Sequence, residues 1–156
     1  MIVKCNINKC SYPPLVLPYL STEEADIDDV VVSKDCYTID SKIDGYCITE
    51  GRDYIVYGIL FYKDQIRYLI CNDNNMPGFF PSILFRITEP YVWFDWEVNE
   101  YTIESEKMMI MGYSAITETY EDLRDLIDNK ADAVDKFLDY KYKEQNWHSR
   151  SKPRTE

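Results

Sequence analysis

Hydrophobic and polar positions alternate in two-residue steps through the middle of the chain, which predicts a β-rich region. Residues 54–62 are rich in β-branched and aromatic side chains, and residues 66–71 repeat this character after a short polar loop. The two segments predict a β-hairpin. Residues 83–87 predict a short turn or strand, and residues 101–103 and 107–113 predict one or two further strands.

The first part of the chain carries weaker patterns. An apolar start precedes Tyr12-Pro13-Pro14 and Pro18. Because proline cannot donate a ladder hydrogen bond, this start predicts an edge strand followed by an extended wrap. Residues 27–32 predict a short strand, alternation around residues 37–39 marks the start of the β-rich region, and Asp44-Gly45 predicts a turn.

Residues 91–98 form the most aromatic segment, and their alternation predicts another strand. One face of that strand would carry Tyr91, Trp93, Asp95 and Glu97, and the other Val92, Phe94, Trp96 and Val98. If the second face is core, the first displays two rings beside two carboxylates. Aromatic anchors with a charged rim are typical of protein-binding hot spots, although a second packed face explains the same pattern.

Near the C-terminus the apolar spacing changes to 3.6-residue steps, which predicts one long helix over residues 120–144. Thr119 and Asp122 predict its N-terminal cap. Carboxylates at alternating steps of three and four residues share the opposite face: Glu118, Glu121, Asp125, Asp128, Asp132, Asp135 and Asp139. Like charges at this spacing cost an isolated helix about 0.2–0.5 kcal/mol per pair. The row therefore favours a role outside the chain, with a solvated helix face as the simpler explanation.

Together these elements predict an α+β domain: a curved, mostly antiparallel sheet or partly open barrel, with one long C-terminal helix packed on it. The chain has 156 residues, which suits a single domain. We expect this domain to span residues 1–146 and residues 147–156 to form a flexible basic tail.

The composition narrows the class of partner. The formal net charge is −11, which argues against binding to nucleic-acid phosphates or anionic membranes. No stretch is apolar enough to cross a membrane, and we expect a cytoplasmic protein with reduced cysteines. A basic protein partner, or imitation of a polyanion, fits the charge.

Candidate chemistry is sparse. The single histidine, His148, lies in the predicted tail, so a nucleophile paired with a histidine base is not expected. The five cysteines form no C-x-x-C pair, and the loop at residues 72–78 departs from the calcium-binding pattern. We therefore predict no metal, no cofactor and no enzymatic activity, with a small hydrolase using two carboxylates as an open alternative.

Three segments carry a resemblance to known families. They resemble the core of an SH3-like barrel and comprise Gly51-Arg52-Asp53-Tyr54-Ile55-Val56-Tyr57-Gly58-Ile59, Ile66-Arg67-Tyr68-Leu69-Ile70-Cys71-Asn72-Asp73, and Gly78-Phe79-Phe80-Pro81 with Leu84-Phe85. In its acidity, small size and lack of catalytic residues, the whole chain also resembles bacterial immunity proteins, the cytosolic antidotes of contact-dependent and other polymorphic toxins. That resemblance implies neutralisation of a basic nuclease toxin by acidic residues that cover its active site. It rests on overall character, so no family site residues carry over.

The sequence thus predicts a small acidic binding protein, most simply a toxin inhibitor of the immunity-protein kind. The candidate partner-binding residues are Asp125, Asp128, Asp132, Asp135, Tyr91, Trp93, Asp95 and Glu97. A phage-type DNA mimic that inhibits a DNA-binding enzyme is the main alternative. Neither the strand order nor the oligomeric state follows from the sequence.

Overall fold

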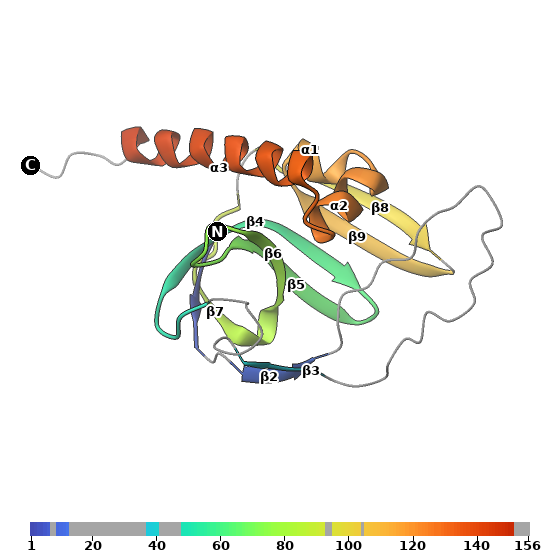
Figure 1. Ribbon diagram of the computed structural model, residues 1–156, viewed down its shortest axis with the longest axis horizontal. Helices are drawn as coiled ribbons and strands as arrows, with labels where there is room; N and C mark the ends of the chain where they lie inside the picture. Colours follow the sequence, from blue (N-terminus) through green and yellow to red (C-terminus); the bar gives the residue numbers. More distant parts are fainter. Residues whose placement is uncertain (7–8, 13–36, 41–47, 93–94, 104, 152–156) are drawn as a thin grey trace, which may run out of the picture.

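The chain forms an antiparallel sheet that stays open, with helices packed on one side of it (Figure 1). The computed structural model describes residues 1–6, 9–12, 37–40, 48–92, 95–103 and 105–151. This architecture confirms the predicted α+β class. The strand predicted at residues 27–32 and the turn predicted at Asp44-Gly45 lie outside the described residues.

The sheet is built from seven strands, and a separate two-stranded sheet lies beside it. The strands of the main sheet are β1 (Ile2–Cys5), β4 (Asp53–Tyr62), β5 (Gln65–Cys71), β6 (Pro77–Pro81), β7 (Phe85–Glu89), β8 (Glu97–Ile103) and β9 (Glu106–Gly112). The small sheet pairs β2 (Lys9–Tyr12) with β3 (Tyr37–Asp40). The helices are the 3-10 turn η1 (Ser82–Leu84), α1 (Ser114–Thr117), α2 (Tyr120–Ile127) and α3 (Ala131–Ser151).

The long strand β4 organises the main sheet. Its neighbour on one side is β5, followed by β6. On the other side its first residues, 53–55, pair with β1, and its last residues, 58–62, pair with β9. The sheet therefore forks: β7 continues from β1, and β8 continues from β9. Because β1 pairs with both β4 and β7, it is an inner strand, and the prediction of an N-terminal edge strand was wrong.

The β-hairpin predicted from the sequence is confirmed as β4 and β5, and its loop is one residue shorter at its C-terminal end than the gap between the two predicted strands. Only Lys63 and Asp64 lie between the strands, and both adopt positive φ angles, 49° and 60°. Such a turn matches the right-handed twist of the flanking strands, which sets the register Tyr62↔Gln65.

Strand β4 contributes side chains to two hydrophobic cores, one on each of its faces, and a β-bulge changes which residues face each core. The pairing with β5 shifts between Val56 and Gly58, so side chains beyond the bulge change faces by one residue. Val56 and Ile59 lie in the strand core, whereas Tyr57 and Leu60 lie in the helix core. The strand core contains Met1, Val3, Cys5, Ile48, Tyr54, Val56, Ile59, Tyr68, Ile70, Phe80 and Leu84. The helix core contains Tyr57, Leu60, Tyr62, Leu69, Ile103, Met108, Ile110, Tyr113, Ile116, Tyr120, Leu123, Leu126 and Phe137.

Two glycines pair next to the bulge, since Gly58 lies opposite Gly112 of β9. A Cβ at Gly112 would lie 3.0 Å from the Tyr57 carbonyl oxygen and 2.8 Å from Cδ1 of Ile116. A Cβ at Gly58 would meet the same Ile116 methyl group at 2.8 Å. Both glycines therefore leave the space into which α1 presses Ile116 against the sheet.

The predicted single helix over residues 120–144 was wrong, because the chain breaks into α2 and α3. Asn129 adopts a left-handed φ of 54°. The Lys130 N–H bonds to the Asp125 carbonyl and the Asn129 N–H to the Leu126 carbonyl, the hydrogen-bond pattern of a Schellman motif. The predicted N-terminal cap is confirmed, since the Asp122 N–H donates to the Thr119 hydroxyl at 3.1 Å.

The last helix is longer at its C-terminal end than the sequence predicts. Helix α3 continues to Ser151, beyond the predicted domain boundary at residue 146, and residues 152–156 lie outside the described part of the chain. No helix among the described residues is long and apolar enough to cross a membrane.

The aromatic segment before β8 is not the strand that its alternation predicts. Strand β8 begins only at Glu97, and Tyr91 and Val92 lie outside any strand. Residues 93 and 94, which include the predicted contact residue Trp93, lie outside the described residues. Strand β9 ends at Gly112, the partner of Glu97, so β9 offers no ladder partner to residues before Glu97.

Candidate binding surface

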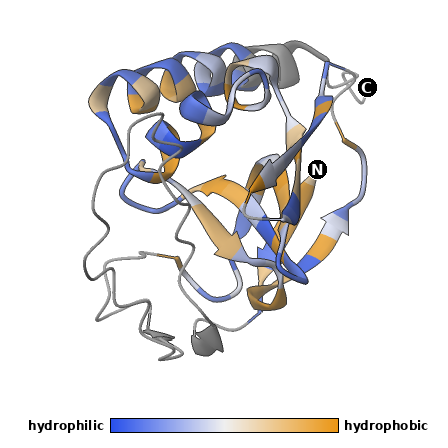
Figure 2. Ribbon diagram, turned by 90° about the vertical axis from the view of Figure 1, so that its right-hand side faces the viewer, coloured by the Kyte–Doolittle hydropathy of each residue, from blue (hydrophilic) through white to orange (hydrophobic). Residues whose placement is uncertain are grey.

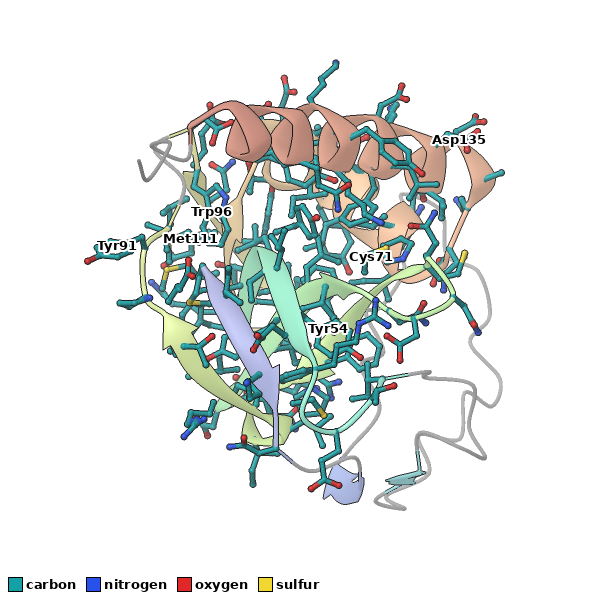
Figure 3. All side chains as sticks on the ribbon, turned by 90° about the vertical axis from the view of Figure 1, so that its left-hand side faces the viewer. Tyr54, Cys71, Tyr91, Trp96, Met111 and Asp135 are labelled. Carbon is teal, nitrogen blue, oxygen red and sulfur yellow. The ribbon has the colours of Figure 1, made fainter. Side chains whose placement is uncertain are left out.

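Helix α3 buries one face and exposes a row of aspartates on another. Val134 and Phe137 are buried, and Phe137 belongs to the helix core. Asp132, Asp135 and Asp139 are exposed, and none of them takes part in an ion pair with the described side chains. Figure 3 shows Asp135 at one end of α3, directed away from the body of the protein. These three residues are called the aspartate row below.

The rest of the predicted acidic face has a different role. Asp125 is half-buried, and its carboxylate lies 2.7 Å from Nζ of Lys130 and 3.6 Å from Nη2 of Arg124. The hydrogen bond from Lys130 lowers the pKa of Asp125. Asp128 is exposed but forms the C-cap of α2. Asp125 therefore stabilises the turn between α2 and α3 through its ion pair with Lys130. Because Lys130 and Arg124 lie beside this carboxylate, the prediction of a face with unmixed charge was wrong.

A second ion pair mixes charge into the helical region. Nζ of Lys136 lies 3.8 Å from the Asp122 carboxylate, which links α3 to α2. Both side chains are partly exposed, so this contact contributes little to stability, on the order of 0–1 kcal/mol. Its consequence is electrostatic, because it neutralises Asp122, whereas Asp132, Asp135 and Asp139 have no described cation partner.

The structure brings the aromatic segment and α3 together at one contact. The hydroxyl of Tyr140 on α3 donates a hydrogen bond to the Asp95 carboxylate at 3.3 Å. The Tyr140 ring stacks on Tyr113, with centroids 3.8 Å apart and planes at 8°. Asp95 and Glu97 are exposed, and Tyr91 has an exposed fraction of 81%.

An apolar area that the sequence did not single out adjoins this segment. Trp96 and Met111 pack on the edge of the strand core, and Val98 pairs with Met111 across β8 and β9. Val98 and Met109 are both partly exposed, at 55% and 38%. Figure 3 shows Tyr91, Trp96 and Met111 gathered on one side of the molecule. The alternation of Met109 and Met111 with buried residues in β9 was the sequence signal for this face.

A polar pocket of about 240 Å³ was also missed by sequence reasoning. It is lined by Arg52, Asp53, Tyr54, Ile55, Tyr57, Cys71, Asn72, Asp73, Asn75, Lys141 and Gln145. These residues come from the start of β4, the loop after β5 and the second half of α3. Because the three segments are far apart in sequence, no local spacing could have indicated the pocket.

One wall of the pocket is a closed hydrogen-bond network around Asp73. Its carboxylate accepts from Nη1 of Arg52 at 2.7 Å, from the Tyr54 hydroxyl at 2.9 Å and from the Thr49 hydroxyl at 2.6 Å. The Thr49 N–H donates to the Tyr54 oxygen at 2.7 Å. Burial raises the pKa of Tyr54 to about 12, so this phenol stays protonated and donates to Asp73 at neutral pH.

The opposite wall contains a thiol and an amine in contact. Nζ of Lys141 donates to Sγ of Cys71 at 3.3 Å and to Oδ1 of Asn75. Burial raises the pKa of the Cys71 thiol, and the neighbouring Lys141 opposes that shift. A thiol with a raised pKa is a weak nucleophile at neutral pH, which does not favour a catalytic role for Cys71.

No cluster of three or more histidine, cysteine, aspartate or glutamate side chains that could hold a metal ion occurs among the described residues. No protein-family model, curated protein or solved structure matches the chain.

Figure 2 shows hydrophilic and hydrophobic residues in alternation along the helices above the sheet. The aspartate row belongs to the exposed residues of this helical layer.

Proposed function

We propose that the chain binds a basic protein partner and blocks the partner's active site or nucleic-acid site. The observation that carries this proposal is the aspartate row of Asp132, Asp135 and Asp139. Three exposed carboxylates follow one helix without a described cation partner, in a protein of net charge −11. Asp132 and Asp139 are seven residues apart, which corresponds to about 10.5 Å along a helix.

This arrangement suits electrostatic steering of a basic surface. Opposite potentials raise association rates by roughly 10–10³-fold, and the effect weakens as salt screens charges beyond about 8–10 Å. The Tyr140–Asp95 contact places the exposed Tyr91 segment near the same helix. Aromatic side chains that become buried on binding would then slow dissociation.

The partner class that fits best is a basic toxin of the nuclease type, so that the chain would act as an immunity protein in the cytoplasm. Such a partner presents cationic groups that normally contact phosphates, and carboxylates can occupy the same positions. DNA mimicry is less well supported, because the turn at Asn129 interrupts the regular carboxylate spacing on which it depends. A two-carboxylate hydrolase is also less well supported. The pKa of Asp125 is lowered, whereas a general acid needs a raised pKa.

Charge reversal at the aspartate row tests the proposal. The first step is to establish whether the gene beside that of this chain encodes a basic toxin domain. That purified domain is then the probe, with nuclease inhibition and association rate measured at two salt concentrations. We expect Asp132→Lys with Asp135→Lys to slow association by about tenfold or more and to flatten its salt dependence.

The matched control reverses Glu50 and Glu106, which are exposed and belong to no helix. Each double variant changes the net charge by the same amount, from −11 to −7, since every reversal adds two charges. Equal binding by the wild type and the α3 variant would contradict the role of the row. If the control variant slows association by the same factor, the effect comes from net charge alone and not from the aspartate row.

A further inference from the structure

The polar pocket beneath α3 differs in charge from the rest of the molecule. Figure 3 shows Tyr54 and Cys71, from opposite walls of this pocket, below the helix. Two cations, Arg52 and Lys141, line it together with two acids, Asp53 and Asp73. Its formal charge is therefore zero, in a protein whose net charge is −11.

Both acids of the pocket already have cationic partners. Asp73 accepts hydrogen bonds from Arg52, Tyr54 and Thr49. Asp53 lies 3.6 Å from Nζ of Lys4, which comes from the neighbouring strand β1. Neither acid forms an ion pair with Lys141, so neither neutralises that ammonium group at short range.

Both cations of the pocket retain donor capacity, and Lys141 also has no described carboxylate partner. An ammonium group has three N–H donors, and Lys141 directs two of its contacts to neutral acceptors, Asn75 and Cys71. No carboxylate lies within ion-pair distance of Lys141 among the described side chains. Arg52 uses Nη1 toward Asp73, and its guanidinium group carries further N–H donors.

We propose that this pocket binds a small anion carrying a phosphate or carboxylate group, held between Lys141 and Arg52. The amide groups of Asn72, Asn75 and Gln145 line the same space and can donate to anionic oxygens. The pocket volume of about 240 Å³ limits the size of the ligand. Pockets for drug-sized ligands span about 300–1,000 Å³, so an inorganic anion or a small organic acid fits better than a nucleotide.

A bound anion would tie α3 to the sheet at a second place. The helix core fixes α3 through Phe137, one turn before Lys141. An anion shared by Lys141 and Arg52 would link the second half of α3 to the start of β4. Because such a ligand binds only the folded chain, it should raise the thermal stability with concentration.

The test uses the full chain titrated separately with inorganic phosphate and with acetate, at constant ionic strength, and followed by amide NMR shifts and thermal unfolding. We expect saturable shifts at Cys71, Asn75 and Lys141, with a dissociation constant of order 1 mM for so small a ligand. Saturation by phosphate alone would define a phosphate site, and saturation by acetate alone a carboxylate site.

Variants at the two cations complete the test. Lys141→Gln and Arg52→Gln should each weaken binding by about tenfold or more, because each removes a charged hydrogen-bond donor. The matched control is Lys143→Gln, which removes the same charge from an exposed position on the same helix outside the pocket. The proposal is overturned if neither anion saturates, or if Lys143→Gln weakens binding as much as Lys141→Gln. The result does not depend on a protein partner.

Discussion

The Tyr140 hydroxyl of α3 donates a hydrogen bond to the Asp95 carboxylate, 3.3 Å away in the segment before β8. This contact joins two regions that the sequence predicts separately as parts of one binding surface. The same tyrosine stacks on Tyr113 at the start of α1 and meets the ring of Tyr57 of β4 edge to face. Tyr140 therefore connects the helical layer, the sheet and the exposed aromatic segment.

Tyr140→Phe should separate the hydrogen bond from the ring packing. The variant keeps the stacked ring and removes the donor to Asp95. Because the bond is exposed to solvent, we expect a loss in the free energy of unfolding near the lower end of the usual range, about 0.5 kcal/mol. Urea denaturation measures it. Tyr142→Phe, a change at a half-exposed position on the same helix, should alter the free energy by less.

Asn129→Ala should reveal whether the chain breaks between α2 and α3. Alanine at the observed φ of 54° is strained, and we expect a loss of about 1 kcal/mol in stability. Asn129→Gly should retain stability, because glycine adopts this conformation without steric cost. In a continuous helix the order would reverse, since alanine is the best helix former and glycine among the worst. Thermal unfolding of both variants distinguishes the two outcomes.

Asp125→Asn should destabilise the chain in a way that depends on pH. Lys130 lowers the pKa of Asp125 in the folded state, so the pair stabilises the fold above the unfolded-state pKa of about 4. This contribution is lost as the pH falls through the lower, folded pKa. We expect a difference of about 0.2–1 kcal/mol from the wild type at pH 7, which shrinks below about pH 4.

The control for this prediction is Asp135→Asn, an exposed position without a described ion pair. Its stability should follow that of the wild type across the same pH range. Urea denaturation at several pH values provides the measurement. A gap between Asp125→Asn and the wild type that persists unchanged into the acidic range would contradict the ion pair with Lys130.

The two paired glycines should respond differently to a change at Ile116. Gly58→Ala and Gly112→Ala each overpack the bulge, and we expect losses of about 1–3 kcal/mol. The nearest atom at Gly58 is the Ile116 methyl group at 2.8 Å, whereas Gly112 also faces the Tyr57 carbonyl oxygen at 3.0 Å. Ile116→Val should therefore restore more stability to Gly58→Ala than to Gly112→Ala. Equal rescue of both variants would contradict this geometry.

Local patterns predicted the elements whose stability is local. The alternation in residues 54–71 predicted the β4–β5 hairpin, and Thr119 with Asp122 predicted a helix start. The apolar stripe also predicted helical structure correctly in this region. Because the stripe continues across the turn between α2 and α3, it gave no sign that the helix is broken there. The available signal was Asn129 among polar neighbours, since asparagine tolerates the left-handed conformation that ends a helix.

Features that depend on distant pairing were not predictable in the same way. Alternation over residues 91–98 looked like a strand, but a strand needs a partner, and β9 ends where Glu97 pairs with Gly112. The Asp73 network joins Arg52 and Tyr54 to a loop beyond β5. The separation of Asp125 from the aspartate row likewise required the fold, because its pairing with Lys130 follows from the turn.

The burial of β4 on both faces has a consequence for how this protein can be divided. A single strand supplies Val56 to the strand core and Tyr57 to the helix core. A fragment without the C-terminal helices would expose the helix-core face of β4, and a fragment without β4 would leave those helices nothing to cover. The chain should therefore unfold in one cooperative transition and resist being split into two halves that fold on their own.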